Sequence, residues 1–341
     1  MQVLFKNDLL DDSGMSICGK VILVDSGDNL ISRGYKLFDK QGSCKVSDRK
    51  FYLPSRFALT RRLLRAEITS FYHLANGDRI AVAKKGIFIQ KKGAKTFEKC
   101  FAMPRGSKPL NLCFAPSGNI YFGEYFQNLE KQSVNIYCSD DNAKNWHMAY
   151  TFEAGNINHI HGLFFDKYTN RIWVATGDRE NECIIGYTED EFKTFHEVFR
   201  GGQEYRTCQL FFYKDFIVFG TDTQYEQNVI KKFDRKTLEI TVLQEVQGSV
   251  IKGGQVGDVA FISTTVEPSK VNTDKYAHLW VTKDGLHWEE RYKAKKDCWP
   301  SIFQFGTFEF PQYYGVDKLE RLYFSGRALK GLDGKSTYID L

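Results

Sequence analysis

Two histidines one residue apart, His159 and His161, are the side chains of this sequence best suited to chemistry. They lie in the stretch Asn158-His159-Ile-His161-Gly162, whose alternation favours a β-strand, so both imidazoles point to one side of it. Such a pair can hold a divalent metal ion or act as base and acid. The other interpretation is two structural histidines bonded to neighbouring carboxylates. A divalent metal near His159 and His161 is therefore one hypothesis, and the sequence indicates no other cofactor.

Four further side chains complete the predicted catalytic group. Glu124 and Asp178 each follow a short apolar strand that ends in glycine, and Tyr205 and Arg206 are adjacent in a polar stretch. Carboxylates bond sugar hydroxyls or transfer protons, and an arginine pairs with the carboxylate of an acidic sugar. Each also has a structural interpretation, because the carboxylates can bond exposed backbone groups and Arg206 can pair with Asp178 or Asp222.

A second set of side chains is predicted to bind substrate, because its members lie beside the same polar stretches or near the ends of other short strands. These residues are Gln203, Asp222, Glu267, Trp299 and Arg327. Aromatic rings stack on sugar faces, and the polar groups bond hydroxyls or carboxylates. Asp222 follows Gly-Thr as Asp178 follows Thr-Gly, which indicates equivalent positions in a repeat and favours a structural role for Asp222.

A short motif with fixed spacing recurs along the chain. It places Ser or Thr, Asp, a small or apolar residue and an aromatic residue at relative positions 1, 3, 5 and 8. The four copies run from Gln90 to Phe97 (without the acid), Ser139 to Trp146, Thr188 to Phe195, and Thr282 to Trp288 (one residue shorter). The closing aromatics are separated by 49, 49 and 93 residues, and 93 is close to twice 49.

This period predicts a propeller, because repeats of about 40 to 50 residues are typical of propeller blades. A copy without its aromatic falls at Phe233-Asp234-Arg235, and extrapolation places further units near 47–51 and 334–338. About seven units of ~48 residues follow. We therefore predict one all-β propeller domain over residues 1–341, with seven four-stranded antiparallel blades and six blades as the alternative. Residues 56–67 have helical spacing and predict a short helix or an irregular connection.

The repeated motif itself is expected to be structural. Its Asp and Ser side chains can bond backbone groups of a turn, and its aromatic residue can pack between blades. Ligands of a propeller bind instead where the innermost strands end around the central channel. The candidate residues above are therefore expected to meet at one mouth of that channel.

The motif resembles the Asp box, or BNR repeat, of sialidase-like propellers, where it forms the hairpin turn between the two outer strands of a blade. The series Gly123-Glu124-Tyr125, His159-Ile-His161, Trp173-Val-x-Thr-Gly-Asp178 and Gly202-Gln203-x-Tyr205-Arg206 resembles a group of bacterial BNR-repeat proteins, often encoded with surface-polysaccharide genes and described as glycosidase-like. The resemblance implies a glycan-related role. The Arg-Ile-Pro motif of true sialidases is only echoed by Tyr52-Leu-Pro54-Ser-Arg56, so sialidase activity itself is not predicted.

The paired histidines with Tyr205 and Arg206 also resemble propeller-type polysaccharide lyases. In those enzymes a His or Tyr removes the proton beside a uronate carboxylate, which an Arg or a metal neutralises. The leading hypothesis is an enzyme that cleaves a glycosidic bond in an acidic or surface polysaccharide, by hydrolysis or by elimination, with a glycan or glycoconjugate as its partner. The alternatives are a non-catalytic glycan-binding or scaffold propeller and a protein-interaction propeller.

Composition and charge argue against other classes. The net charge is +5, from 47 basic and 42 acidic residues that are mostly scattered, which does not favour a nucleic-acid partner. No apolar run reaches the ~18 residues of a membrane span. The N-terminus does not resemble a secretory signal, and the eight cysteines lack zinc-site spacing, so we expect a cytoplasmic protein with reduced cysteines. The oligomeric state is not indicated.

Overall fold

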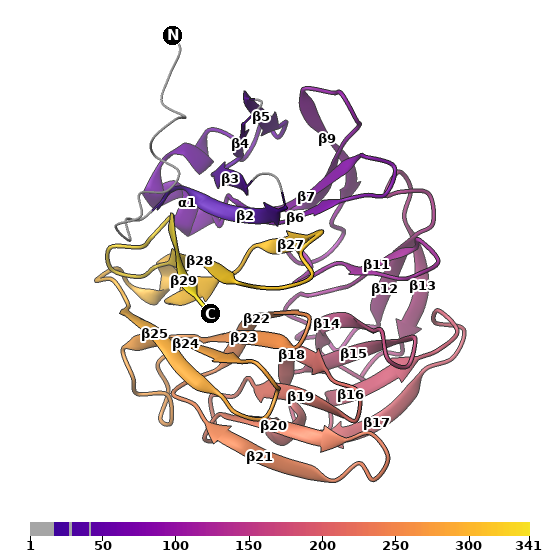
Figure 1. The fold of residues 1–341 in the computed structure, drawn as a ribbon. Helices are drawn as coiled ribbons and strands as arrows, with labels where there is room; N and C mark the ends of the chain where they lie inside the picture. The colour runs from indigo at the N-terminus through magenta and orange to yellow at the C-terminus, as the bar shows by residue number, and fades with distance from the viewer. Residues whose placement is uncertain (1–16, 27–28, 41) are drawn as a thin grey trace.

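The computed structural model describes residues 17–26, 29–40 and 42–341, and within these ranges the regular secondary structure is almost entirely β-strand (Figure 1). Four sheets of four strands each take up chain-consecutive strands, paired antiparallel because short turns join them. Their strands are β10 (Cys113–Phe114), β11 (Ile120–Gly123), β12 (Val134–Ser139) and β13 (His147–Phe152); β14 (His159–Asp166), β15 (Arg171–Gly177), β16 (Cys183–Thr188) and β17 (His196–Gly201); β18 (Thr207–Phe212), β19 (Phe216–Thr221), β20 (Val229–Asp234) and β21 (Ile240–Glu245); and β22 (Val250–Val256), β23 (Val259–Thr264), β24 (Tyr276–Thr282) and β25 (Glu289–Lys295).

A sheet of nine strands contains two further antiparallel runs of four. The runs are β2 (Lys20–Asp25), β3 (Asn29–Arg33), β4 (Lys36–Asp39) and β5 (Gly42–Val46), followed by β6 (Ile68–His73), β7 (Arg79–Ala83), β8 (Gly86–Gln90) and β9 (Thr96–Ala102). The last strands of the two runs, β5 and β9, pair in parallel. The ninth strand, β27 (Gln312–Tyr314), pairs in parallel with β2 at the other edge.

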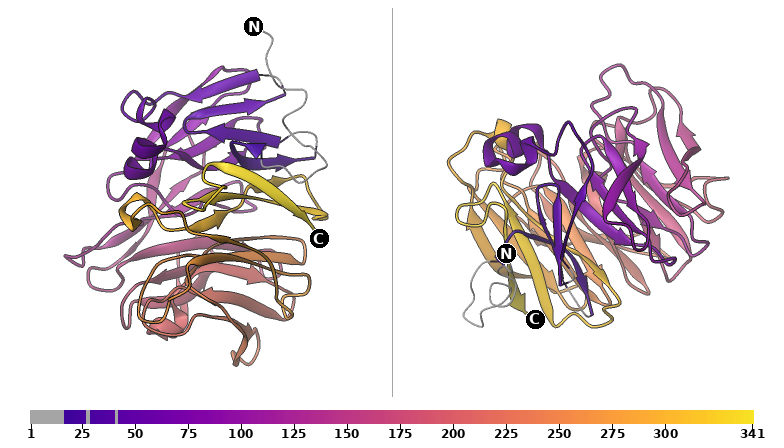
Figure 2. Two further views of the ribbon diagram at one scale, coloured as in Figure 1. Left: turned by 90° about the vertical axis from the view of Figure 1, so that its left-hand side faces the viewer. Right: turned by 90° about the horizontal axis from the view of Figure 1, so that it is seen from above.

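The remaining sheet joins the two ends of the described chain. It consists of β26 (Thr307–Glu309), β28 (Arg321–Arg327), β29 (Lys335–Asp340) and, as its fourth strand, β1 (Ile17–Cys18) from the N-terminal side. Figure 2 shows the yellow C-terminal strands beside the indigo N-terminal ones in both views. The first and last described segments of the chain therefore pair within one sheet, as closure of a ring of sheets requires.

The first strands of the two runs in the nine-stranded sheet contact each other, β2 with β6, and so do first strands of neighbouring sheets, β14 with β18, β18 with β22 and β22 with β26. This all-β arrangement of antiparallel four-stranded units around a common set of inner strands is consistent with a β-propeller. In the part of the chain that the structure describes, no helix has the length and apolar character needed to cross a bilayer.

The recurring motif forms the turn between the third and fourth strands of its sheet. In the copy between β12 and β13, the amides of Lys144 and Asn145 donate to Asp141 Oδ1 (3.0 and 2.9 Å), and the Ala143 amide donates to Ser139 Oγ (2.9 Å). The same position between β8 and β9 has lost its acid. There the Lys92 amide donates to Asp78 Oδ1 (2.8 Å), so an aspartate from the turn between β6 and β7 contacts this turn.

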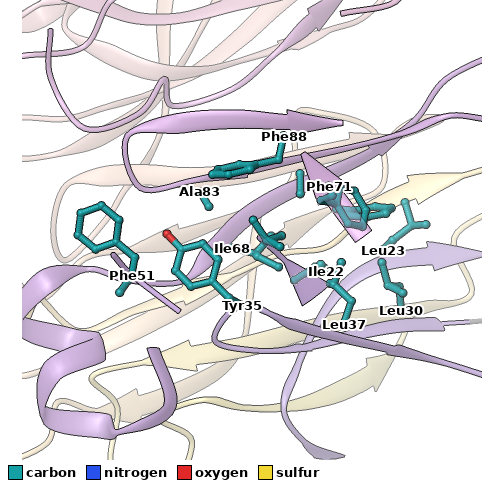
Figure 3. Close-up of a cluster of buried hydrophobic side chains, with 14 residues drawn as sticks. Ile22, Leu23, Leu30, Tyr35, Leu37, Phe51, Ile68, Phe71, Ala83 and Phe88 are labelled. Carbon is teal, nitrogen blue, oxygen red and sulfur yellow. The ribbon is translucent and has the colours of Figure 1, made fainter. Parts of the chain in front are cut away.

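The closing aromatics of the motif pack between successive sheets, as expected. Phe97 is fully buried in the cluster between the β2–β5 and β6–β9 runs, together with Tyr35, Phe71 and Phe88 (Figure 3). Trp146, Phe195 and Trp288 each join a cluster between two other sheets. Burying one such ring contributes about 2 to 3 kcal/mol, so the motif stabilises both its own turn and the contact between sheets.

The two extrapolated copies of the motif do not lie in a turn between a third and a fourth strand. Residues 47–51 follow β5, the fourth strand of its run, although Asp48 Oδ1 does accept bonds from the Lys50 and Phe51 amides. Residues 334–338 lie largely within β29, a third strand whose partner β1 comes from the other end of the chain. Equal spacing cannot be extended past a point where distant segments share one sheet. The helical pattern of 56–67 forms η1 (Pro54–Arg56) and α1 (Ala58–Leu64). Two further short helical turns are η2 (Gln203–Tyr205) and η3 (Ser301–Phe303).

Candidate functional site

The predicted site residues that follow second strands lie at one end of the sheets. Within a sheet the second strand ends where the first begins, because the two are antiparallel; His159 of β14 pairs with Gly177 of β15, and Thr207 of β18 with Thr221 of β19. Asp178 and Asp222 come directly after Gly177 and Thr221. We call this end, where first strands begin and second strands end, the N-terminal mouth.

A cavity of about 340 Å³ lies at the N-terminal mouth. Segments next to each of the sheets contribute to its wall, and most of the lining side chains are polar. The charged members are Arg65, Glu67, Lys108, Asp178, Arg206, Asp222, Lys252, Glu267 and Arg327. An adjoining cavity of about 530 Å³ shares Asp178 and Arg206 and is also lined by Gln203. Five predicted site residues, Asp178, Arg206, Asp222, Glu267 and Arg327, thus meet in one space.

The two histidines lie beneath this cavity and face Asp178. His159 Nε2 and His161 Nε2 are 3.0 Å apart, and they lie 3.4 and 3.0 Å from Asp178 Oδ2 and Oδ1. Both rings are buried, with 4% and 1% of their surface exposed. His161 also rests on Gly177, where a Cβ atom would lie 2.4 Å from the ring. The glycine before Asp178 is therefore needed for the histidine to reach the carboxylate.

Asp178 connects the histidines to Arg206. The Arg206 Nη2 atom lies 3.0 Å from Asp178 Oδ1 and 3.5 Å from Asp222 Oδ2. Burial alone would raise the pKa of Asp178, but its contacts with the adjacent His159 and His161 side chains hold that pKa far below its ordinary value. Burial lowers the pKa of Arg206, and the two aspartates more than offset this effect. Asp178 and Arg206 are therefore both ionised at neutral pH.

Glu267 has the opposite electrostatic character. Burial raises the pKa of its carboxyl group to about 7, and the negative charges of Asp222 and Asp178 add to this effect while Arg206 opposes it. At neutral pH about half of the Glu267 side chains carry a proton. The cavity therefore contains ionised carboxylates together with one carboxyl group that can donate a proton.

Two lysines of the cavity were not predicted from the sequence. Lys108 and Lys252 form no ion pair within the described ranges. Burial lowers the pKa of both amines, and for Lys108 the positive charges of Arg327 and Lys252 lower it further. Arg327, by contrast, is paired with Glu309 and with Glu67 (3.1 Å). Only the inward direction of β22 would have identified Lys252, and the loop that holds Lys108 has no sequence signature.

Other predicted catalytic residues have structural partners outside the cavity. Glu124 is paired with Arg105 and accepts the Asn135 amide (2.9 Å). Tyr205 stacks on Phe199, with ring centroids 5.2 Å apart.

Among the predicted substrate-binding residues, Trp299 lies against the Arg62 guanidinium. The Gln203 side chain donates to the Asp178 backbone oxygen (2.8 Å) and accepts from Arg206 (3.3 Å), so it positions both. Tyr125, which the sequence did not single out as a site residue, lines the cavity and lies 4.4 Å from the His159 ring.

Two groups of side chains have the composition and spacing to hold a metal ion. One is His159, His161 and Asp178, and the other is His161, Cys208 and Asp222. Burial raises the pKa of Cys208 well above its usual value, and nearby Asp222 adds to this effect. The thiol therefore stays protonated and is a poor ligand, which leaves the first group as the better candidate.

No family model matches this sequence. No curated protein matches it either. Solved structures do match. A chain of the mitotic checkpoint complex has a TM-score of 0.57 at 10% identity, covering 100% of this chain and 99% of that one. The GH74 xyloglucanase of Xanthomonas campestris has a TM-score of 0.52 at 15% identity, covering 80% and 45%.

The extracellular domain of BT4673 from B. thetaiotaomicron has a TM-score of 0.54 at 11% identity, covering 96% of this chain and 41% of that one. The present chain therefore spans less than half the length of the matched xyloglucanase and BT4673 chains. At these identities the likeness concerns the fold, which is of the propeller type that includes GH74 enzymes.

Proposed function

We propose that the chain is a carbohydrate-active enzyme that binds an acidic glycan in the cavity at the N-terminal mouth and hydrolyses a glycosidic bond. The observation that carries this proposal is the composition of the cavity. Glu267, Asp222 and Asp178 share one space with two lysines, Lys108 and Lys252, that have no carboxylate partner among the residues the structure describes. Carboxyl groups in two protonation states are what glycoside hydrolysis requires, and lysine amines can donate hydrogen bonds to the acidic group of a sugar.

In the proposed reaction Glu267 donates its proton to the glycosidic oxygen as the carbon–oxygen bond breaks. A water molecule attacks the anomeric carbon and loses a proton to Asp222. That carboxylate uses only its Oδ2 atom in its contacts with Arg206 (3.5 Å) and Cys208 (3.4 Å). The Asp222 proton returns to Glu267 or to solvent, so the net change is the addition of water across the bond. Lys108 and Lys252 would hold the acidic group of the sugar.

Hydrolysis is favoured over elimination by the protonation of the available groups. Elimination needs a base to remove a proton from carbon. The tyrosine that reaches the cavity is Tyr125, and burial raises the pKa of its phenol far above the ordinary value, so it is a poor base. Tyr205, the tyrosine predicted from the sequence, is stacked on Phe199.

Two finer features of the fold belong to the same proposal. We infer seven blades, counting the two runs of the nine-stranded sheet separately, and we assign the recurring turn to the Asp-box, or BNR, family of propellers. The turn position between third and fourth strands supports this assignment. The fold-level likeness to GH74 enzymes supports a glycan substrate only weakly, because 15% identity carries fold alone.

The test compares the wild type with Glu267→Gln on a panel of acidic oligosaccharides. Hydrolysis is measured as the release of reducing ends. We expect a loss in kcat of about 10² to 10⁴, because the amide cannot donate the proton. Glu245→Gln, at an exposed position on β21, is the matched control and should keep full activity. Products with an ultraviolet-absorbing unsaturated uronate would instead show elimination.

A second candidate is a glycan-binding propeller without catalysis. It is favoured by the saturation of Asp178, whose two carboxylate oxygens already contact His159, His161 and Arg206. Calorimetric binding of an acidic oligosaccharide with no turnover by the wild-type protein would establish this alternative.

A further inference from the structure

Three hydrogen-bond acceptors converge at one point beneath the N-terminal mouth. They are the Nε2 atoms of His159 and His161 and the carboxylate of Asp178, with separations of 3.0, 3.0 and 3.4 Å. Both histidines lie on β14, and Asp178 directly follows its hairpin partner β15. Both histidine rings are almost fully buried. What lies between such atoms depends on which nitrogen of each ring carries the proton.

The opposite nitrogen of each ring faces a backbone carbonyl oxygen. His161 Nδ1 lies 2.9 Å from the Thr207 oxygen, and His159 Nδ1 lies 2.9 Å from the Phe126 oxygen. A carbonyl oxygen can only accept, so both Nδ1 atoms carry the proton. The Asn158 side-chain amide nitrogen is also 3.2 Å from His159 Nδ1. Because Nδ1 already carries a proton, the Asn158 amide cannot donate a hydrogen bond to it. In the neutral rings both Nε2 atoms therefore present lone pairs to each other.

Lone pairs 3.0 Å apart repel unless a cation lies between them. The two candidates are an additional proton on one ring and a metal ion. The Nδ1–H to carbonyl bond with a free Nε2 is the arrangement that proteins use to orient metal-binding histidines. Ligand atoms about 2.1 Å from one ion lie about 3.0 Å apart at right angles and about 3.4 Å apart at tetrahedral angles. The observed separations match this range.

We propose that His159, His161 and Asp178 bind one divalent first-row transition-metal ion through two imidazole nitrogens and one carboxylate oxygen. Two histidines and one carboxylate leave further coordination positions open, which suits this class of ion. Asp178 lines the cavity whereas the histidines do not, so the open positions lie on its side. Arg206 would bond the ligating carboxylate from outside, and Gln203 would fix the Asp178 backbone. The site is independent of the proposed hydrolysis and holds for a non-catalytic protein as well.

Another buried histidine shows that the convergence is specific to this place. His278 also lies between carboxylates, with Nδ1 2.8 Å from Glu290 Oε2 and Nε2 3.1 Å from Asp274 Oδ2. Its two partners are on opposite sides of the ring, so each nitrogen has its own acceptor and no common point is formed. His278 is therefore the matched control for the proposed metal site.

The experiment is a titration of the chelator-treated full chain with Co²⁺, monitored by visible absorption and by calorimetry. A second measurement is elemental analysis of the protein as purified without a metal-affinity column. We expect one equivalent of Co²⁺ to bind. His161→Ala and Asp178→Asn should weaken binding by more than about 100-fold, beyond the usual effect of removing an outer partner of a ligand. His278→Ala should keep the wild-type affinity.

Asp178→Asn preserves the shape of the side chain, so it tests the site even if His161→Ala fails to fold. Nitrogen-15 spectra of the histidine rings give a readout that does not depend on any reaction. Metal binding should shift the Nε2 signals of two rings and leave their Nδ1 protons in place. Equal Co²⁺ affinity in the wild type, Asp178→Asn and His278→Ala would overturn the proposal. It would also be overturned by a wild-type chain that binds no Co²⁺ and shows a doubly protonated ring.

Discussion

The carboxylates of the outer turns and those of the N-terminal mouth illustrate two ways in which a propeller uses an acid. In the turns, Asp190 Oδ1 accepts the Thr194 amide four residues away (2.9 Å), and this bond and the Thr194 hydroxyl lower the Asp190 pKa to about 2. At the mouth, Asp178 meets His161 and Arg206, which are 17 and 28 residues away and in different strands or sheets.

The difference lies in what neutralises the charge. Turn carboxylates are half-buried or exposed, and their partners are backbone amides and side chains of the same turn, so each turn is complete by itself. Mouth carboxylates are partly or fully buried, and their partners are ionisable side chains from neighbouring sheets. A change at a turn should therefore have a local effect, and a change at the mouth should disturb several sheets.

The largest effect is expected from Asp178→Ala, which leaves Arg206 buried with one carboxylate in place of two. We expect the free energy of unfolding to fall by about 3 kcal/mol, because breaking a buried ion pair strands a charge. Urea denaturation at pH 7 with a chelator present measures this without a metal contribution. A loss below about 1 kcal/mol, the scale of a single hydrogen bond, would show that the mouth carboxylates are no more coupled than those of the turns.

A smaller effect is expected from Glu267→Gln, and it depends on pH. The pKa of Glu267 is raised to about 7 in the folded chain, so its contribution to stability is present below about pH 4.5 and is lost as the pH rises through 7. The charged groups that share its cavity are Arg65, Glu67, Lys108, Asp178, Arg206, Asp222, Lys252 and Arg327, and of these Asp222, Arg206 and Asp178 act on the pKa of Glu267.

The Glu267→Gln chain should be as stable as the wild type at pH 4 and about 1.5 kcal/mol more stable at pH 8. This is roughly half the value of the full shift, because solvent reaches part of the side chain. Denaturant midpoints at the two pH values provide the measurement, with Glu245→Gln as control. Parallel pH curves for the wild type and Glu267→Gln would contradict the protonated state assigned to this residue.

The smallest effect is expected at a turn. Asp141→Ala removes acceptors for the Lys144 and Asn145 amides and should destabilise the chain by about 1 kcal/mol, since these amides can turn to water. Asp140→Ala, at the exposed neighbouring position, should change the thermal midpoint very little. If both substitutions destabilise equally, the turn hydrogen bonds of Asp141 are not the source of the effect.

Much of the fold was predictable because its signals are local. The spacing of the motif located the turns at 139–146 and 188–195, and the alternation of short apolar runs located second strands such as β15 and β19. The extrapolated copies of the motif at 47–51 and 334–338 do not form the turn between third and fourth strands, because sheet membership there depends on pairing between the two ends of the described chain.

The candidate site was predictable in part. Asp178, Asp222 and Arg327 each lie at the end of the second strand of their own sheet. Strand direction therefore places all three at the same mouth. Lys108 and Lys252 had no such signal, and Glu124 was selected although Arg105 already neutralises it. Charge compensation depends on distances between segments far apart in the chain, which spacing along a strand does not contain.

The sequence by itself determined that this protein is all-β, that its outer turns repeat, and that His159 and His161 point the same way. These properties follow from backbone geometry over a few residues. Only the tertiary structure decided that Asp178 lies opposite both histidines, that Glu267 holds its proton near neutral pH, and that the two ends of the chain share a sheet. Burial and convergence created these features, and both exist only once the sheets have packed around one another.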